Sequence, residues 1–99
     1  MTREEILSAA KKCVCGDRDQ QYGSPENSFK VIANLWFSYL HGKKLIKDGV
    51  YILAEDVAAM MALFKIARIA TGQNKEDNWI DIAGYAACGG EVQSGGSND

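Results

Sequence analysis

The fold of this chain is decided by residues 57–70, which read VAAMMALFKIARIA. Apolar side chains occupy nearly every position around this segment, and only Lys65 and Arg68 interrupt them. Because Gly72 follows closely, the pattern predicts a helix from about Ala54 to Thr71. A helix without a polar face is buried on several sides. In a chain of only 99 residues, we therefore expect a second copy of the chain to cover part of this helix.

Apolar residues at helical spacing predict three further helices, over about residues 3–15, 24–42 and 76–88. Gly89 and Gly90 are expected to stop the last of these. The link that precedes it is short, so this last helix should form an antiparallel hairpin with the apolar helix. The sequence thus predicts an all-α bundle of four main helices.

The bulk composition favours one small domain with no strong surface charge. We expect a helical domain over residues 1–90 and a flexible tail, rich in Gly and Ser, over residues 91–99. The net charge is −2, and without a basic surplus nucleic acid is not an expected partner. The longest apolar run, residues 57–64, is too short to span a bilayer. No signal-type apolar segment opens the chain, so we expect a cytoplasmic protein that does not bind membranes.

The longest polar segment between two helix-patterned blocks covers residues 17–27, which read DRDQQYGSPEN. Pro25 suits the first position of a helix. A helix start has unpaired N–H groups and partial positive charge, so it can hold a phosphate or a carboxylate. Arg18, Tyr22 and Asn27 lie beside this helix start. We interpret the segment as a binding loop for an anionic molecule.

Two cations on the apolar helix also indicate a site. Lys65 and Arg68 are one turn apart and share a face, and unpaired buried charges are costly. In the hairpin, Arg68 should lie opposite Asp77 and Asp81, and Tyr85 continues the face of these two acids. One interpretation is a structural ion pair between Arg68 and Asp77 or Asp81. Another is a ligand pocket edged by Lys65, Arg68, Asp81 and Tyr85, and the two can coexist.

Asp56 stands at the expected start of the apolar helix and also allows two interpretations. It either complements the positive end of the helix or binds a metal. Asp56 and Arg68 are twelve residues apart, about 18 Å along a helix axis, whereas Asp81 should lie near Arg68. One hairpin cannot easily bring Asp56 and Asp81 to one Mg²⁺. The helix of residues 24–42 or a second subunit would have to close the gap.

Four segments together resemble a small protein family common in phages and prophages. They read RDQQYGSPENSF over residues 18–29, IANLW over residues 32–36, DVAAMMALFKIAR over residues 56–68 and DNWIDIAGYA over residues 77–86. This family looks like a distant relative of the MazG-type all-α nucleoside triphosphate pyrophosphohydrolases. Those enzymes are helical bundles, usually oligomeric, and hold Mg²⁺ with carboxylates from adjacent helices.

The resemblance implies a nucleotide-handling protein, and possible catalysis by Mg²⁺ held on Asp56, Asp77 and Asp81. MazG-type enzymes carry a Glu-x-x-Glu pair on one helix and a Glu-x-x-Asp pair on the next. This chain has fewer carboxylates at a different spacing. The resemblance therefore implies a nucleotide-shaped pocket more strongly than it implies hydrolysis.

The ligand-binding residues expected around such a pocket are Arg18, Tyr22, Asn27, Lys30, Lys65, Arg68 and Tyr85. A rival hypothesis needs no metal. In it, a homo-oligomer sequesters a host immune nucleotide, such as a cyclic dinucleotide, between its subunits. A third hypothesis is a purely structural or interaction protein.

Overall fold

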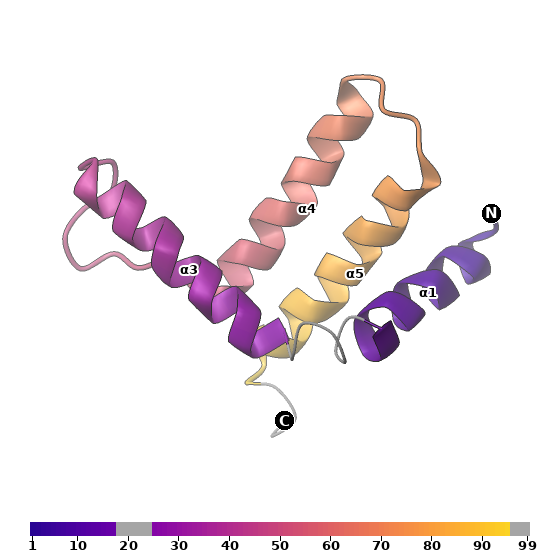
Figure 1. Ribbon diagram of the computed structural model, residues 1–99, viewed down its shortest axis with the longest axis horizontal. Helices are drawn as coiled ribbons and strands as arrows, with labels where there is room; N and C mark the ends of the chain where they lie inside the picture. The colour runs from indigo at the N-terminus through magenta and orange to yellow at the C-terminus, as the bar shows by residue number, and fades with distance from the viewer. Residues whose placement is uncertain (18–24, 96–99) are drawn as a thin grey trace.

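The computed structural model describes residues 1–17 and 25–95, apart from the side chains of Asp17 and of residues 25–27. Within these ranges the protein is all-helical (Figure 1). In chain order its elements are α1 (Arg3–Lys12), the π-helical turn η1 (Cys13–Asp17), α3 (Pro25–Gly42), α4 (Ala54–Ala70) and α5 (Glu76–Gln93). The predicted all-α class with four main helices is confirmed. None of the helices in the described part of the chain is long and apolar enough to cross a membrane.

Helices α4 and α5 form the predicted antiparallel hairpin (Figure 1). Gly72 ends α4 with a φ of 93°, a backbone conformation that favours glycine. The side-chain amide of the buried Asn78 donates a hydrogen bond to the backbone oxygen of Gln73 at 2.6 Å. This bond ties the first turn of α5 to the short link and fixes how the two helices meet.

The predicted end of the last helix at Gly89 and Gly90 is wrong, because α5 continues through both residues to Gln93. Residues 91–93 therefore belong to the helix rather than to a tail. A Cβ atom at Gly89 would lie 2.9 Å from the Cβ atom of Ala58, so this glycine allows α4 and α5 to approach closely. Glycine in a helix costs about 1 kcal/mol relative to alanine, and here tertiary packing overrides that preference.

Helix α1 lies alongside α5, on the side of the hairpin away from α3 (Figure 1). Its α-helical part ends at Lys12, earlier than the predicted Cys15, and η1 follows. A Cβ atom at Gly84 of α5 would lie 3.1 Å from Cγ1 of Val14. The absence of a side chain at Gly84 therefore lets η1 approach α5.

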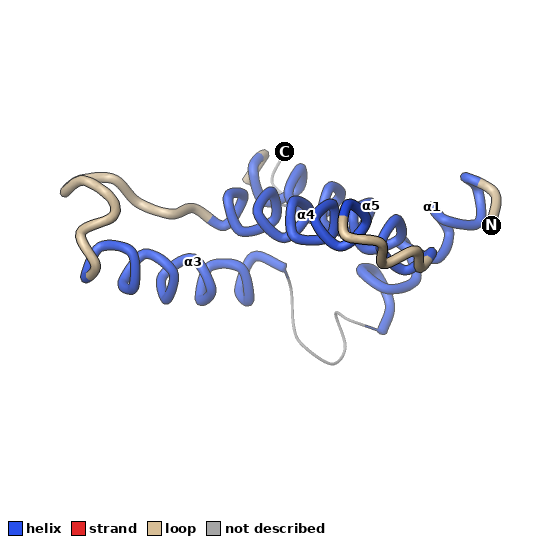
Figure 2. Tube along the Cα trace, turned by 90° about the horizontal axis from the view of Figure 1, so that it is seen from above, coloured by secondary structure: helices blue, strands red, loops and turns tan. Residues whose placement is uncertain are grey.

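Helix α3 lies in a different layer from the hairpin (Figure 2). It runs from Pro25 to Gly42, as predicted, and its Phe29 and Ala33 are buried against Val57 and Ala58 of α4. These residues form the centre of the core together with Cys88 of α5. At the other end of α3, the ring of Phe37 stacks on His41 and on Tyr51 of the following loop, with centroid distances of 5.1 Å and 5.0 Å.

The core is small for a chain of this length. Its buried apolar residues among the described ones are Ala10, Phe29, Ala33, Val57, Ala58, Ile80 and Cys88. On α4 only Val57 and Ala58 are buried, whereas Leu63 and Phe64 are 65% and 50% exposed. The prediction that α4 is buried on several sides is therefore not fulfilled within one chain.

Candidate functional site

A cavity of about 280 Å³ lies where η1, α3, α4 and α5 meet. Residues from all four elements line it: Cys13, Val14, Phe29, Lys65, Ile80, Asp81, Gly84, Tyr85 and Cys88. The cavity brings together three of the residues predicted from the sequence, namely Lys65, Asp81 and Tyr85. The close approach of η1 to Gly84 positions one of its walls.

The charged wall of the cavity is an ion pair between α4 and α5. Nζ of Lys65 lies 2.8 Å from Oδ2 of Asp81, and the two side chains are 18% and 37% exposed. One interpretation of the sequence paired Arg68 with Asp77 or Asp81. Lys65 pairs with Asp81 instead, because Lys65 lies one turn nearer to the start of α4 and faces the second turn of α5. The antiparallel hairpin therefore sets the pair one turn away from the predicted position.

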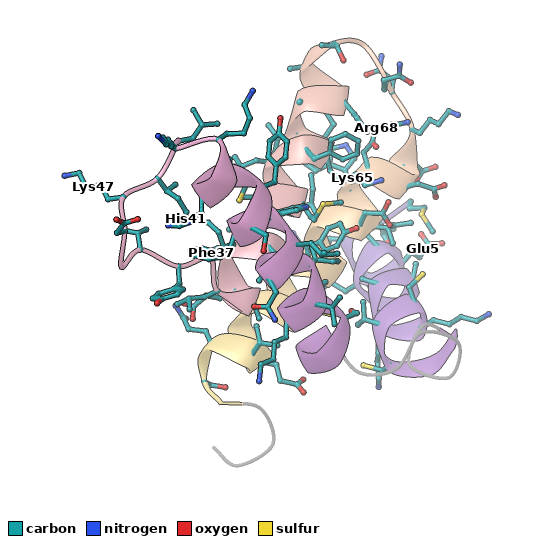
Figure 3. The ribbon with its side chains drawn as sticks, turned by 60° about the vertical axis from the view of Figure 1, so that its left-hand side comes forward. Glu5, Phe37, His41, Lys47, Lys65 and Arg68 are labelled. Carbon is teal, nitrogen blue, oxygen red and sulfur yellow. The ribbon has the colours of Figure 1, made fainter. Side chains whose placement is uncertain are left out.

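Arg68 follows Lys65 by one turn on the same side of α4 (Figure 3). Its Nε atom is buried and has no hydrogen-bond partner among the described residues. Its guanidinium lies over the ring of Phe64, 5.8 Å from the centroid, a distance that allows a cation–π interaction. A buried donor without an acceptor costs about 1–3 kcal/mol. Arg68 does not line the cavity itself, and lies one turn of α4 beyond Lys65, which does.

The aromatic side of the cavity is built by Phe29 and Tyr85. Their ring centroids lie 6.3 Å apart with an interplanar angle of 34°. Phe29 is 2% exposed and belongs to the core, so it holds a fixed position. Tyr85 is half-buried and also borders a second, larger groove on the outer side of the hairpin. The cavity thus joins a charged wall to an aromatic one.

The three carboxylates predicted to hold Mg²⁺ do not meet within one chain. Oδ2 of Asp56 accepts a hydrogen bond from the backbone N–H of Leu53 at 2.8 Å, so this side chain caps the start of α4. The hairpin places this start beside the end of α5, where Gln93 Nε2 donates to Glu55 at 3.0 Å. Asp77 lies in the opposite, first turn of α5. Of the two interpretations of Asp56, the contacts agree with a role at the start of α4.

These positions do not fit a shared metal ion. Lys65, the partner of Asp81, is nine residues beyond Asp56 on α4, about 14 Å along the axis. Carboxylate oxygens bind Mg²⁺ at about 2.1 Å, so one ion cannot contact both Asp56 and Asp81 of one chain. Residues 1–17 and 25–95 hold no group of three or more His, Cys, Asp or Glu side chains suited to a metal.

Four predicted ligand-binding residues remain. Arg18 and Tyr22 fall outside the described residues, and so does the side chain of Asn27 in the first turn of α3. Lys30 borders a separate cavity of about 510 Å³ between α3 and the loop before α4, where Tyr51 is also found. Lys30 therefore does not face the same cavity as Lys65.

Comparison with known proteins places the chain in a family. The model of a domain of unknown function, DUF6378, matches residues 5–93. The chain belongs to the DUF6378 family. The match takes in all of the described helices except the first two residues of α1, and thus both walls of the cavity.

Relatives of this DUF6378 chain are phage proteins. It is 42% identical to the Gene 55 protein of Mycobacterium phage L5 over 81 residues, which is 82% of this chain and 47% of that protein. It is 41% identical to the Gene 55 protein of Mycobacterium phage D29 over 85 residues, which is 86% of this chain and 51% of that protein. The chain spans about half the length of these curated relatives. The predicted resemblance to a phage family is confirmed, and no solved structure matches.

The sequence did not single out three features of this DUF6378 site. Phe29, Cys13 and Cys88 are not among the residues that the sequence predicted for the site. All three line the cavity, where Cys13 is exposed and Cys88 is buried. Gly84, within the segment AGYA, was the signal that could have located the cavity, because glycine inside a helix often marks a close approach.

Proposed function

We propose that this DUF6378 protein binds a small anionic molecule of the nucleotide type in the cavity between η1, α3, α4 and α5, and that one chain alone does not hydrolyse it. The observation that carries the proposal is the state of the two cations of α4. Asp81 neutralises Lys65, whereas Arg68 has a buried donor without an acceptor among the described residues.

An anion in the cavity would contact Lys65, and one that extends a further turn along α4 would also reach Arg68. Lysine has three donors, so Lys65 can keep its bond to Asp81 and still donate to a phosphate oxygen. Arg68 would supply the planar guanidinium that suits phosphate groups. The local charge of Lys65, Arg68 and Asp81 together is +1 in a chain of net charge −2, which favours a local anion site.

The aromatic wall and the size of the cavity support a ligand with a ring. Tyr85 is half-buried and offers ring surface to the cavity, whereas Phe29 is 2% exposed and packs behind it. Stacking on aromatic side chains is tolerant of base identity, because every base has a π face. The volume of about 280 Å³ is near the lower end of ligand cavities, which hold about 300–1,000 Å³. A single nucleotide unit matches this size better than a larger molecule does.

The separation of the carboxylates supports binding without hydrolysis. A MazG-type reaction needs several carboxylates around Mg²⁺, and here Asp56 caps α4 while Asp81 pairs with Lys65. A hydrolytic version would need acids from a second chain. The role we favour in a phage-infected cell is therefore sequestration, in which the protein lowers the free concentration of a nucleotide signal.

The test is to incubate the protein with Mg²⁺ and a set of linear and cyclic nucleotides, remove unbound nucleotide, and denature the protein by heat. Chromatography of the released material should show intact nucleotide. The Arg68→Met variant should release at least tenfold less, whereas Lys30→Met should match the wild type, because Lys30 borders a different cavity. If the released material contains cleaved products, the protein hydrolyses the nucleotide and does not sequester it. If the protein retains none of the nucleotides, the proposal is refuted.

A further inference from the structure

The outer side of the α4–α5 hairpin carries a groove whose lining, among the described residues, comes from these two helices alone. The groove encloses about 720 Å³ and runs between the two helices. We call it the hairpin face, and its apolar residues are Ala59, Ala62, Leu63, Ile66, Ile82 and Ala86. Trp79 precedes Ile82 by three residues on α5 and is 53% exposed, so it extends this surface toward the hairpin link.

The chain exposes more surface than a folded monomer of its mass. Its accessible area is 7098 Å², whereas about 5,500 Å² is typical of a monomeric protein of 10.8 kDa, an excess of about 1,500 Å². Its radius of gyration is 14.7 Å, compared with about 13 Å for a compact domain of 100 residues. Both values indicate a fold that is completed by an additional layer.

We propose that a second copy of this chain packs its own hairpin face against the first, so that two α4–α5 hairpins form a symmetric four-helix contact. A two-fold contact uses the same surface on both partners, so it requires a surface that is complementary to itself. The hairpin face meets this requirement because it is apolar and carries charge only at one end, on Glu55 and Asp56. A strongly charged partner would find complementary charge only at that end.

The available area fits a stable homodimer. A standard interface buries about 800 Å² on each partner, and permanent homodimers bury more and are more apolar. The excess of about 1,500 Å² belongs to the whole chain, and the hairpin face contributes to it through Leu63 and Ile66, which are 65% and 45% exposed. Small side chains at Ala59, Ala62 and Ala86 let two helices approach closely, while Leu63 and Ile66 supply the apolar volume that packs between them.

Three leucines with nearly equal exposure allow a matched test. Leu7 on α1, Leu35 on α3 and Leu63 on α4 are 64%, 64% and 65% exposed. Sedimentation of the wild type at micromolar concentration should give a mass of two chains. Leu63→Glu should shift it to one chain, because two carboxylates would be buried near the two-fold axis. Leu7→Glu and Leu35→Glu should remain dimeric.

Each outcome decides for or against the proposal. A wild type that sediments as one chain overturns it, and so does a dimer that Leu35→Glu dissociates while Leu63→Glu does not. If Leu63→Glu fails to fold, the wild type and Leu35→Glu decide. A wild type whose melting temperature does not rise with protein concentration is a monomer and overturns the proposal, and so does a dimer that Leu35→Glu dissociates. Nucleotide binding plays no part in these measurements, so they stand apart from the test of the proposed function.

Discussion

Nζ of Lys65 lies 2.8 Å from Oδ2 of Asp81, and this ion pair joins the two helices of the hairpin at the wall of the cavity. The pair uses the acid that could otherwise have neutralised Arg68. The buried donor of Arg68 is consequently left without an acceptor among the described residues. One contact therefore both fastens α4 to α5 and leaves a cation ready for a ligand.

We expect the Lys65–Asp81 pair to stabilise the fold modestly. A double-mutant cycle with Lys65→Met and Asp81→Asn, measured by urea unfolding, should give a coupling of about 1 kcal/mol, the upper end of the range for exposed pairs. The His41–Asp48 pair is equally short at 2.8 Å, but its Asp48 side chain is 97% exposed. Its cycle should give no measurable coupling at pH 7. Equal coupling energies for the two pairs would contradict the claim that the less exposed pair stabilises the fold more.

Arg68→Met should leave the free energy of unfolding unchanged or raise it. The substitution removes a buried donor that has no acceptor among the described residues and keeps an apolar side chain beside Phe64. Thermal unfolding without ligand measures this effect. A loss of more than about 2 kcal/mol would show that Arg68 has a structural partner, because breaking a buried charge pair costs about 3–5 kcal/mol.

Gly89→Ala should destabilise the protein by about 1–3 kcal/mol, the usual cost of overpacking. The new methyl group would lie 2.9 Å from the Cβ atom of Ala58, so the helices would have to move apart. Gly42→Ala is the control, because no atom lies within 4 Å of its added Cβ. It should be neutral or stabilising by up to about 1 kcal/mol through helix propensity. Urea unfolding of both variants measures these changes in the free energy of unfolding.

The start of α1 should show a defined pH dependence. Glu5 accepts a hydrogen bond from the backbone N–H of Thr2 at 2.8 Å, and this bond lowers the pKa of Glu5 below its ordinary value of 4.5. A lowered pKa stabilises the fold above pH 4.5, and the gain is lost as the pH falls through the folded value. Glu5→Gln should therefore be less stable than the wild type at pH 7.

The same comparison at lower pH gives the check. The difference in melting temperature between wild type and Glu5→Gln should shrink steadily from pH 5 to pH 3, as the carboxylate of the wild type becomes protonated. The difference between wild type and Glu4→Gln should be small throughout, because Glu4 has no such capping bond. A Glu5 effect that persists unchanged at pH 3 would show that the capping carboxylate is not its source.

Sequence reasoning located helices where local signals agreed with packing. Pro25 marks the start of α3, and Gly72, with its positive φ, follows the end of α4. Sequence reasoning placed the end of α5 wrongly at Gly89. There the close approach to Ala58 favours a glycine inside the helix rather than after it. That contact joins residues 31 positions apart, so no local pattern could reveal it.

The candidate site was predicted only in part, because local spacing does not reveal contacts between helices. Helical spacing placed Lys65 and Arg68 on one face and Asp81 with Tyr85 on another, and the hairpin brought these faces together. The axial register of the hairpin decided which cation meets Asp81, and spacing within each helix does not fix that register. Lys30 was misplaced because its neighbour Phe29 turns inward, which sends Lys30 toward a different cavity.

The ring of Tyr85 borders both the cavity and the hairpin face, so two separate binding events would act on one side chain. Thermodynamic reciprocity then requires that each event alter the affinity of the other by the same factor. The strength with which such a protein captures its small molecule would consequently depend on its own abundance. At different concentrations of the chain, the same protein would respond to different levels of the molecule.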